Sequence, residues 1–126
     1  MFSQNKIGRF SASLSLYVHG GGWISPRRLE LLVAISRTNS ITRSAKMIGM
    51  SYKGAWVAVE IMNNLAGVPL VMSWQGGRGG GGAKLTAAGQ QLVVELNRLS
   101  ALQTQLVQSV AVLDTRDEEE TLDDIH

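Results

Sequence analysis

Two short stretches of the chain concentrate groups that donate hydrogen bonds to anions. The first is Ser51–Gly54, where a serine, a tyrosine, a lysine and a glycine follow one another. The second is the run from Trp74 to Leu85, which holds six of the chain's 14 glycines together with Arg78 and Lys84. Lysine and arginine bind phosphate, and glycines let backbone N–H groups come close to an anion. These residue types indicate binding of a polyanion rather than catalysis.

The charge distribution favours the same kind of partner. Residues 1–113 carry 11 basic and three acidic side chains, a net charge of +8. Residues 114–126 carry one basic and seven acidic side chains, a net charge of −6. A basic body attracts nucleic acid, although surface charge also serves solubility alone. We expect residues 114–126 to be an acidic, disordered tail, because they contain few apolar side chains.

Other classes of protein are poorly supported by the composition. The chain has no cysteine, and its two histidines stand at positions 19 and 126. The three acidic residues of positions 1–113 lie far apart in the sequence. We therefore expect no enzyme, no metal and no cofactor. There is no apolar run of about 18 residues for a membrane span and no secretory leader. We expect a cytoplasmic protein with no membrane partner and no small-molecule ligand.

Three helices must position the donor groups. Ser25 followed by Pro26 is a typical helix start, and this first helix should end near residues 37–39. Ser40 can cap a short second helix over residues 41–48, which Gly49 can end in the left-handed conformation. Ser51 can cap a third helix from Tyr52 to about Leu65. Short strands are expected at residues 13–18, 70–74 and 83–85, and the last two flank the glycine run.

The second and third helices, joined by a tight turn, have the layout of a helix-turn-helix that binds double-stranded DNA. The third helix would then enter the major groove, and the following hairpin would form a wing against the backbone or minor groove. The expected recognition-helix contacts are Ser51, Tyr52, Lys53, Gly54 and Val57. The expected wing contacts are Gly77, Arg78, Gly79, Gly80 and Lys84. Further contacts to the DNA backbone are expected from Arg27, Arg28, Arg43 and Lys46.

The last helix carries a different signal. Residues 87–112 at 1.5 Å per residue span roughly 39 Å, which is too long to bury against so small a domain. Apolar residues step along it by four and three, as in the seam of a coiled coil, with Gln103 as one polar member. We therefore expect a homodimer, with contacts from Leu92, Leu96, Leu99, Leu106 and Val110.

Residues 25–106 resemble the DNA-binding domain of the molybdate-responsive transcription regulators, the ModE family. The resemblance rests on SPRRLELL, SITRSAKMIGMSYKGAW, EIMNNL and GGRGGGGAKLTAAGQQL. The wider likeness is to the LysR-type winged helix. It implies a mainly α fold with a small β-hairpin wing, of the α+β class, dimerised through its first strand and final helix. Members of the ModE family continue into a molybdate-binding domain, and the acidic stretch after residue 113 gives no expectation of one.

The combined interpretation divides the chain into three parts. These are a flexible N-terminus at residues 1–10, a winged helix-turn-helix domain with its long helix at residues 11–113, and the tail at 114–126. The expected function is a sequence-specific, DNA-binding transcription regulator that is ModE-like but lacks the molybdate domain. Two alternatives stay open. One is a protein-interaction module that pairs through its long helix, and the other is an accessory regulator whose signal comes from a separate ligand-binding protein.

Overall fold

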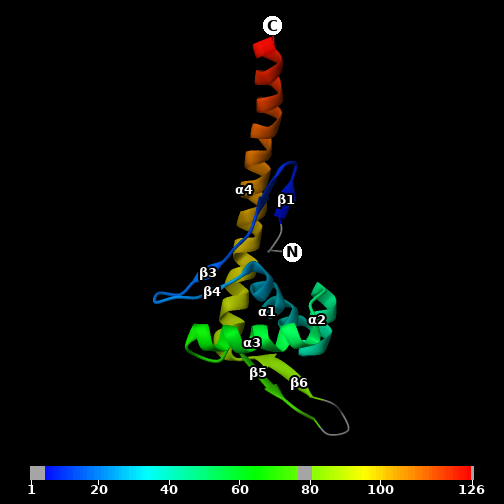
Figure 1. Cartoon of the computed structure of the whole chain (residues 1–126), viewed down its shortest axis with the longest axis vertical. Coiled ribbons are helices and arrows are strands. Elements are labelled where there is room, and N and C mark those ends of the chain that lie inside the picture. The colour runs from blue at the N-terminus through cyan, green and yellow to red at the C-terminus, as the bar shows by residue number, and fades with distance from the viewer. Residues whose placement is uncertain (1–4, 77–80, 126) are drawn as a thin grey trace.

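The computed structural model describes residues 5–76 and 81–125, with side chains for residues 8–76 and 81–113. A small helical body carries a hairpin at one end, and a long helix leaves the body at the other (Figure 1). The expected wing contacts at residues 77–80 lie outside the described residues.

Three helices form the body: α1 (Pro26–Thr38), α2 (Ile41–Ile48) and α3 (Tyr52–Ala66). Each begins after a serine whose side-chain oxygen accepts a hydrogen bond from the backbone N–H three residues later. These bonds satisfy N–H groups that have no partner within the helix. Gly49 ends α2 with a φ of 70°. The predicted starts of all three helices and the predicted end of α2 are therefore confirmed.

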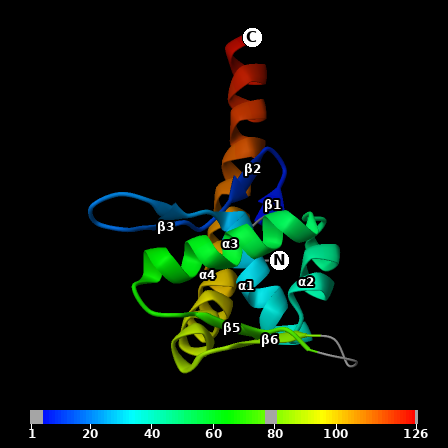
Figure 2. The same ribbon diagram turned by 60° about the horizontal axis from the view of Figure 1, so that its bottom comes forward.

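The wing is an antiparallel pair, β5 (Val71–Trp74) and β6 (Gly82–Leu85), in which Val71 faces Leu85 and Trp74 faces Gly82. Its position at the foot of the body, below α3, is clear in Figure 2. The backbone N–H of Ala83 donates to the carbonyl of Asn39 between α1 and α2 at 3.1 Å. This bond ties the returning strand to the body, at the place where the sequence predicted the hairpin.

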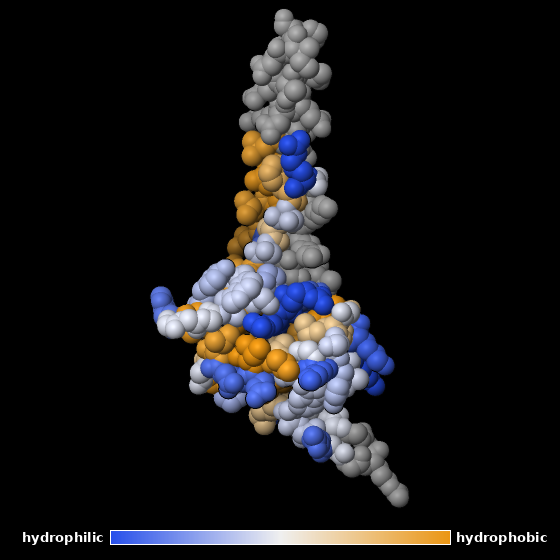
Figure 3. Space-filling model, viewed as in Figure 1, coloured by the Kyte–Doolittle hydropathy of each residue, from blue (hydrophilic) through white to orange (hydrophobic). Residues whose placement is uncertain are grey.

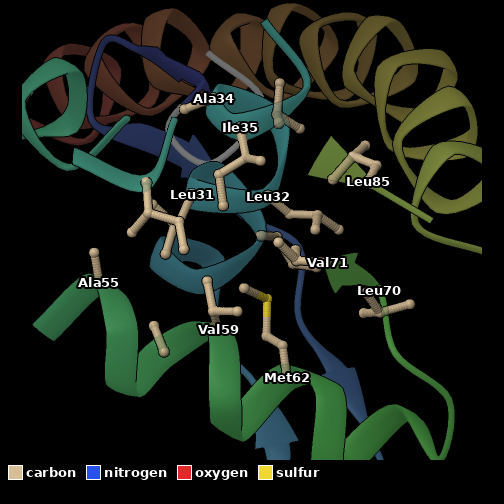
Figure 4. Packing of buried hydrophobic residues seen from close by; sticks show 14 of the residues in the cluster. Leu31, Leu32, Ala34, Ile35, Ala55, Val59, Met62, Leu70, Val71 and Leu85 are labelled. Atoms are coloured by element: carbon tan, nitrogen blue, oxygen red, sulfur yellow. The ribbon is translucent and has the colours of Figure 1, made fainter. Parts of the chain in front are cut away.

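The core is built around α1. All residues from Leu29 to Ile35 are buried, and the helix contacts α2, α3, α4 and β6. Figure 4 shows side chains of α1 packed between α3 and the two wing strands. The labelled members are Leu31, Leu32, Ala34, Ile35, Ala55, Val59, Met62, Leu70, Val71 and Leu85. One apolar cluster therefore fixes the wing and α3 relative to each other.

The final helix, α4, spans Ala87–Ile125 and begins beside the wing. Thr86 accepts a hydrogen bond from the Gly89 N–H through its hydroxyl at 3.1 Å, as a capping residue does. A β-carbon on Gly89 would collide with the carbonyl oxygen of Leu70, so glycine is required where α4 crosses the start of β5. The helix continues past its predicted end near residue 112, through the stretch that we expected to be disordered. No glycine or proline follows Gly89, and glutamate and leucine are good helix formers.

The N-terminus differs from the expectation of a flexible segment. Strands β1 (Asn5–Ile7) and β2 (Phe10–Ala12) pair as a hairpin that contacts α4. Gly8 turns between them with a φ of 63°, a conformation that glycine adopts without strain. A two-stranded hairpin is marginal alone, so the flank of α4 supplies the surface on which it forms.

A second hairpin joins β3 (Leu16–Tyr17) to β4 (Trp23–Ile24), and the rings of Tyr17 and Trp23 stack with centroids 5.8 Å apart. The strand predicted at residues 13–18 is confirmed for these two residues. Within the part of the chain that the structure describes, no helix combines the length and apolar character needed to cross a bilayer.

Candidate nucleic-acid interface

The first turn of α3 presents its expected contact residues outward. Tyr52, Lys53 and Val57 are exposed, while Ala55 beside them is buried in the core. The Tyr52 ring meets the edge of Trp56, with centroids 6.1 Å apart and planes at 72°. This contact fixes the tyrosine hydroxyl at the surface near the start of the helix.

Ser51 and Gly54 act on the backbone of this turn. The Ser51 hydroxyl accepts a hydrogen bond from the Gly54 N–H at 3.0 Å. A β-carbon on residue 54 would lie 2.8 Å from that hydroxyl oxygen, so a larger residue would press on the cap. Both residues therefore shape the helix start, and a direct contact of either with DNA stays a prediction.

The turn between α2 and α3 is held by Arg27 from α1. Its guanidinium donates to the carbonyl of Ile48 at 2.8 Å and to that of Gly49 at 3.4 Å, and it lies 3.6 Å from Glu30. A cation at the end of α2 also stabilises the negative end of the helix dipole. Arg28 likewise donates to the carbonyl of Trp23 at 3.2 Å. Both arginines were expected at the DNA backbone. Their described bonds hold the body together, and a contact of either with DNA stays a prediction.

The start of α3 and the root of the wing share one open hollow of about 280 Å³. Tyr52 and Trp56 line it from α3, and Trp74 lines it from β5. The start of α2 and the two ends of the glycine run complete the lining, through Ser40, Ile41, Thr42, Gln75, Gly76, Gly81 and Gly82. The helix and the hairpin therefore form one continuous surface, rather than facing opposite sides of the molecule.

Packing explains why one position of the glycine run, Gly82, carries no side chain. A β-carbon on Gly82 would collide with the indole of Trp74 on the paired strand. Glycine therefore lets the indole lie across the hairpin, where half of its surface stays exposed. At this position the glycine makes room for an aromatic side chain at the edge of the hollow.

Exposed basic side chains lie on three elements that line the hollow. Arg43 and Lys46 are exposed on α2, Lys53 is exposed on α3, and Lys84 is exposed on β6 opposite Met72. The part of the chain with described side chains contains no group of three or more residues that could hold a metal ion. Chemically, these elements offer hydrogen-bond donors and positively charged side chains.

Comparison with known proteins places this geometry in a family. Residues 26–90 match the family model described as bacterial regulatory helix-turn-helix protein, lysR family. The chain belongs to the lysR family. The matched residues run from the first residue of α1 to the first turn of α4, and so include the helix-turn-helix and the wing.

Two curated relatives show which lysR-type sequences this chain is similar to. It is 49% identical over 85 residues to the molybdenum transport protein ModE of Azotobacter vinelandii, covering 68% of this chain and 32% of that protein. It is 46% identical over 78 residues to the DNA-binding transcriptional dual regulator ModE of Escherichia coli K12, covering 62% and 30%. The chain is thus ModE-like in sequence and spans about a third of the length of these relatives.

A solved structure shows the lysR-type fold directly. The crystal structure of the CbnR_DBD–DNA complex superposes with a TM-score of 0.58 at 20% identity, covering 70% of this chain and 95% of that chain. At this level of identity the likeness establishes the fold. The expected winged helix-turn-helix, mainly helical with a small hairpin, is confirmed.

The residues of the expected dimer seam differ in burial along α4. Leu96 is 1% exposed inside the domain core, and Leu92 packs against that core. The assignment of Leu96 to the seam is therefore corrected, whereas Leu92 is only partly buried and its place in the seam stays a prediction. Farther along α4 an apolar strip stays open, and its apolar side chains are visible in Figure 3. The members of this open strip are Leu99, Leu102, Leu106, Val110 and Leu113.

Sequence reasoning missed several residues of the interface. The sequence predicts Trp74 only as the end of a strand, places Trp56 beside the buried stripe of the third helix, and gives Thr42 and Gln75 no role. A tryptophan at the end of a predicted strand, separated by one glutamine from a glycine run, is a usable signal, because an exposed strand end gives it little to pack against. Thr42 could have been found from its place in the first turn of α2, where backbone N–H groups are available to an anion.

Proposed function

We propose that this chain binds double-stranded DNA as a transcription regulator, with α3 in the major groove and the wing against the adjacent backbone. The observation that carries the proposal is the hollow shared by the start of α3 and the root of the wing. Membership of a family of bacterial regulators supports it, as does the DNA bound by the structural relative. Such a protein works where bacterial chromosomal DNA lies, in the cytoplasm.

Individual roles follow from the exposed side chains. Lys53 suits the acceptors of guanine, and Val57 suits the methyl group of thymine. Arg43, Lys46 and Lys84 suit phosphates on either side. Arg78, outside the described residues, stays our proposed contact for the minor groove. If Arg43, Lys46 and Lys84 each neutralise one phosphate per subunit, the logarithm of the binding constant should fall with the logarithm of salt at a slope of about −2.7.

The binding test compares two variants that lose the same charge. Lys53→Ala should weaken binding to a selected duplex about 10-fold, since one good base contact is removed. Arg98→Ala is the control, because Arg98 lies on α4 and pairs with Glu95 at 2.7 Å, away from the hollow. Fluorescence anisotropy with a labelled duplex across a salt series measures both. Equal weakening by the two variants, or no binding by the unmodified chain at low salt, would contradict the proposal.

We further propose that two copies pair through the open strip of α4, placing two α3 helices about one DNA turn apart. Leu106 is 57% exposed on that strip, so Leu106→Glu should convert a dimer into a monomer in sedimentation velocity. Val112→Glu is the matched control. Val112 is 51% exposed on the same helix, but six residues along it faces a different side. A monomeric unmodified chain, or dissociation by Val112→Glu alone, would rule out this interface.

A further inference from the structure

The outward face of α3 carries one acidic side chain among its expected DNA contacts. Lys53, Val57, Glu60 and Asn64 follow each other at helical spacing and are all exposed. Ala55, Ala58, Val59 and Met62 form the opposite, buried side. The four outward residues therefore make a single stripe along the helix that would lie in the groove.

Glu60 faces the same side as the wing. Together with Lys53 and Ser73 of β5 it lines an open hollow of about 330 Å³ between α3 and the hairpin. Among the residues whose side chains are described, none is recorded in an ion pair or hydrogen bond with the Glu60 carboxylate. The negative charge is thus presented beside Lys53, on the side of α3 that faces the wing.

A carboxylate on this face must meet a hydrogen-bond donor, because phosphates repel it and its hydration is lost in the groove. The major groove offers two kinds of donor, the amino groups of cytosine and adenine. Adenine presents its amino group next to the N7 acceptor, which suits an amide better than a carboxylate. Cytosine presents its amino group with no acceptor on its own major-groove edge and is the better partner.

We propose that Glu60 is a specificity-determining residue that accepts a hydrogen bond from the amino group of a cytosine. This inference rests on the proposed function and names one base that the same surface selects. Lys53 and Glu60 are seven residues apart, roughly 10 Å along the helix axis. At about 3.4 Å per base pair, the guanine read by Lys53 and the cytosine read by Glu60 lie about three base pairs apart.

The test is selection of bound duplexes from a random pool, carried out with the unmodified chain and with Glu60→Gln. The unmodified chain should retain one position with a cytosine preference of about 10-fold per half-site. Glu60→Gln keeps the side-chain shape but can donate, so that preference should fall to about 2-fold or less and shift toward adenine. Glu60→Ala should relax the same position without a new preference.

Glu95→Gln is the matched control, since it removes the same charge from α4. It should leave every position of the selected site unchanged. If Glu60→Gln tightens binding to all sequences equally and leaves the selected site intact, Glu60 acts only by repulsion and the inference is overturned while the proposed function stands. If the unmodified chain selects no duplex at all, both fall together.

Discussion

Helices α1 and α3 begin in the same way but differ in how much of their surface is buried. They are 13 and 15 residues long, and a serine caps each start. In α1 seven successive residues are buried, so the helix is surrounded by other elements for two full turns. In α3 four residues are buried, and the other side carries Lys53, Val57 and Glu60 into solvent.

This difference separates stability from recognition. No side of the middle of α1 is left for a partner, and its contacts set where α2, α3 and β6 lie. The outward side of α3 contributes little packing, so its residues can change without loss of the fold. A family built this way can alter what it recognises through α3 while α1 keeps the frame constant.

The largest expected loss of stability comes from removing a buried side chain of α1. Leu31 is fully buried, so Leu31→Ala removes packed atoms and leaves a cavity between α1 and α3. The free energy of unfolding should fall by about 2–5 kcal/mol. Urea unfolding followed by circular dichroism measures the change in midpoint.

Val57→Ala is the comparison on α3. Val57 is 45% exposed, and alanine is the better helix former, so the free energy of unfolding should stay within about 0.5 kcal/mol. A destabilisation by Val57→Ala as large as that by Leu31→Ala would mean that the outward side of α3 is packed, and the contrast between the two helices would fail.

The sequence predicts local features of this molecule better than it predicts how distant segments of the chain pack together. The serine caps and Gly49 could be read directly, because capping depends on a few neighbouring residues. The hairpin at residues 5–12 could not be read, because it forms against α4, which begins 75 residues farther along the chain. Likewise, the spacing that unites Leu96 with Leu106 cannot say that the first is buried by its own domain and the second is not.

The interface shows the same limit. The lysine and the glycine run were recognisable from their types, and Ser51 from its capping position. Trp74 required the register of the wing, because its relation to Gly82 exists only once β5 and β6 pair. Arg27 is a converse case, since its charge suggested a phosphate, whereas its position opposite the end of α2 gives it carbonyl partners.

A smaller effect is expected where α3 holds the wing. The Asn63 side-chain oxygen accepts hydrogen bonds from the N–H groups of Leu70 at 2.7 Å and Val71 at 3.1 Å, and its amide donates to the Val71 carbonyl at 3.1 Å. Asn63→Ala leaves these partly buried backbone groups without their partner. The free energy of unfolding should fall by about 1–3 kcal/mol.

Hydrogen exchange at individual amides tests this contact more specifically than the free energy of unfolding does. Amide hydrogen exchange at Leu70 and Val71 should accelerate in Asn63→Ala, because both N–H groups lose their acceptor. Asn64→Ala is the neighbouring control, since Asn64 is exposed on the outward side and should leave both amides protected. Unchanged exchange in Asn63→Ala would show that the contacts of the wing with α1 and α4 hold it without this bond to α3. Faster exchange would instead show that α3, besides presenting its own outward side, sets the position of the hairpin that completes the surface.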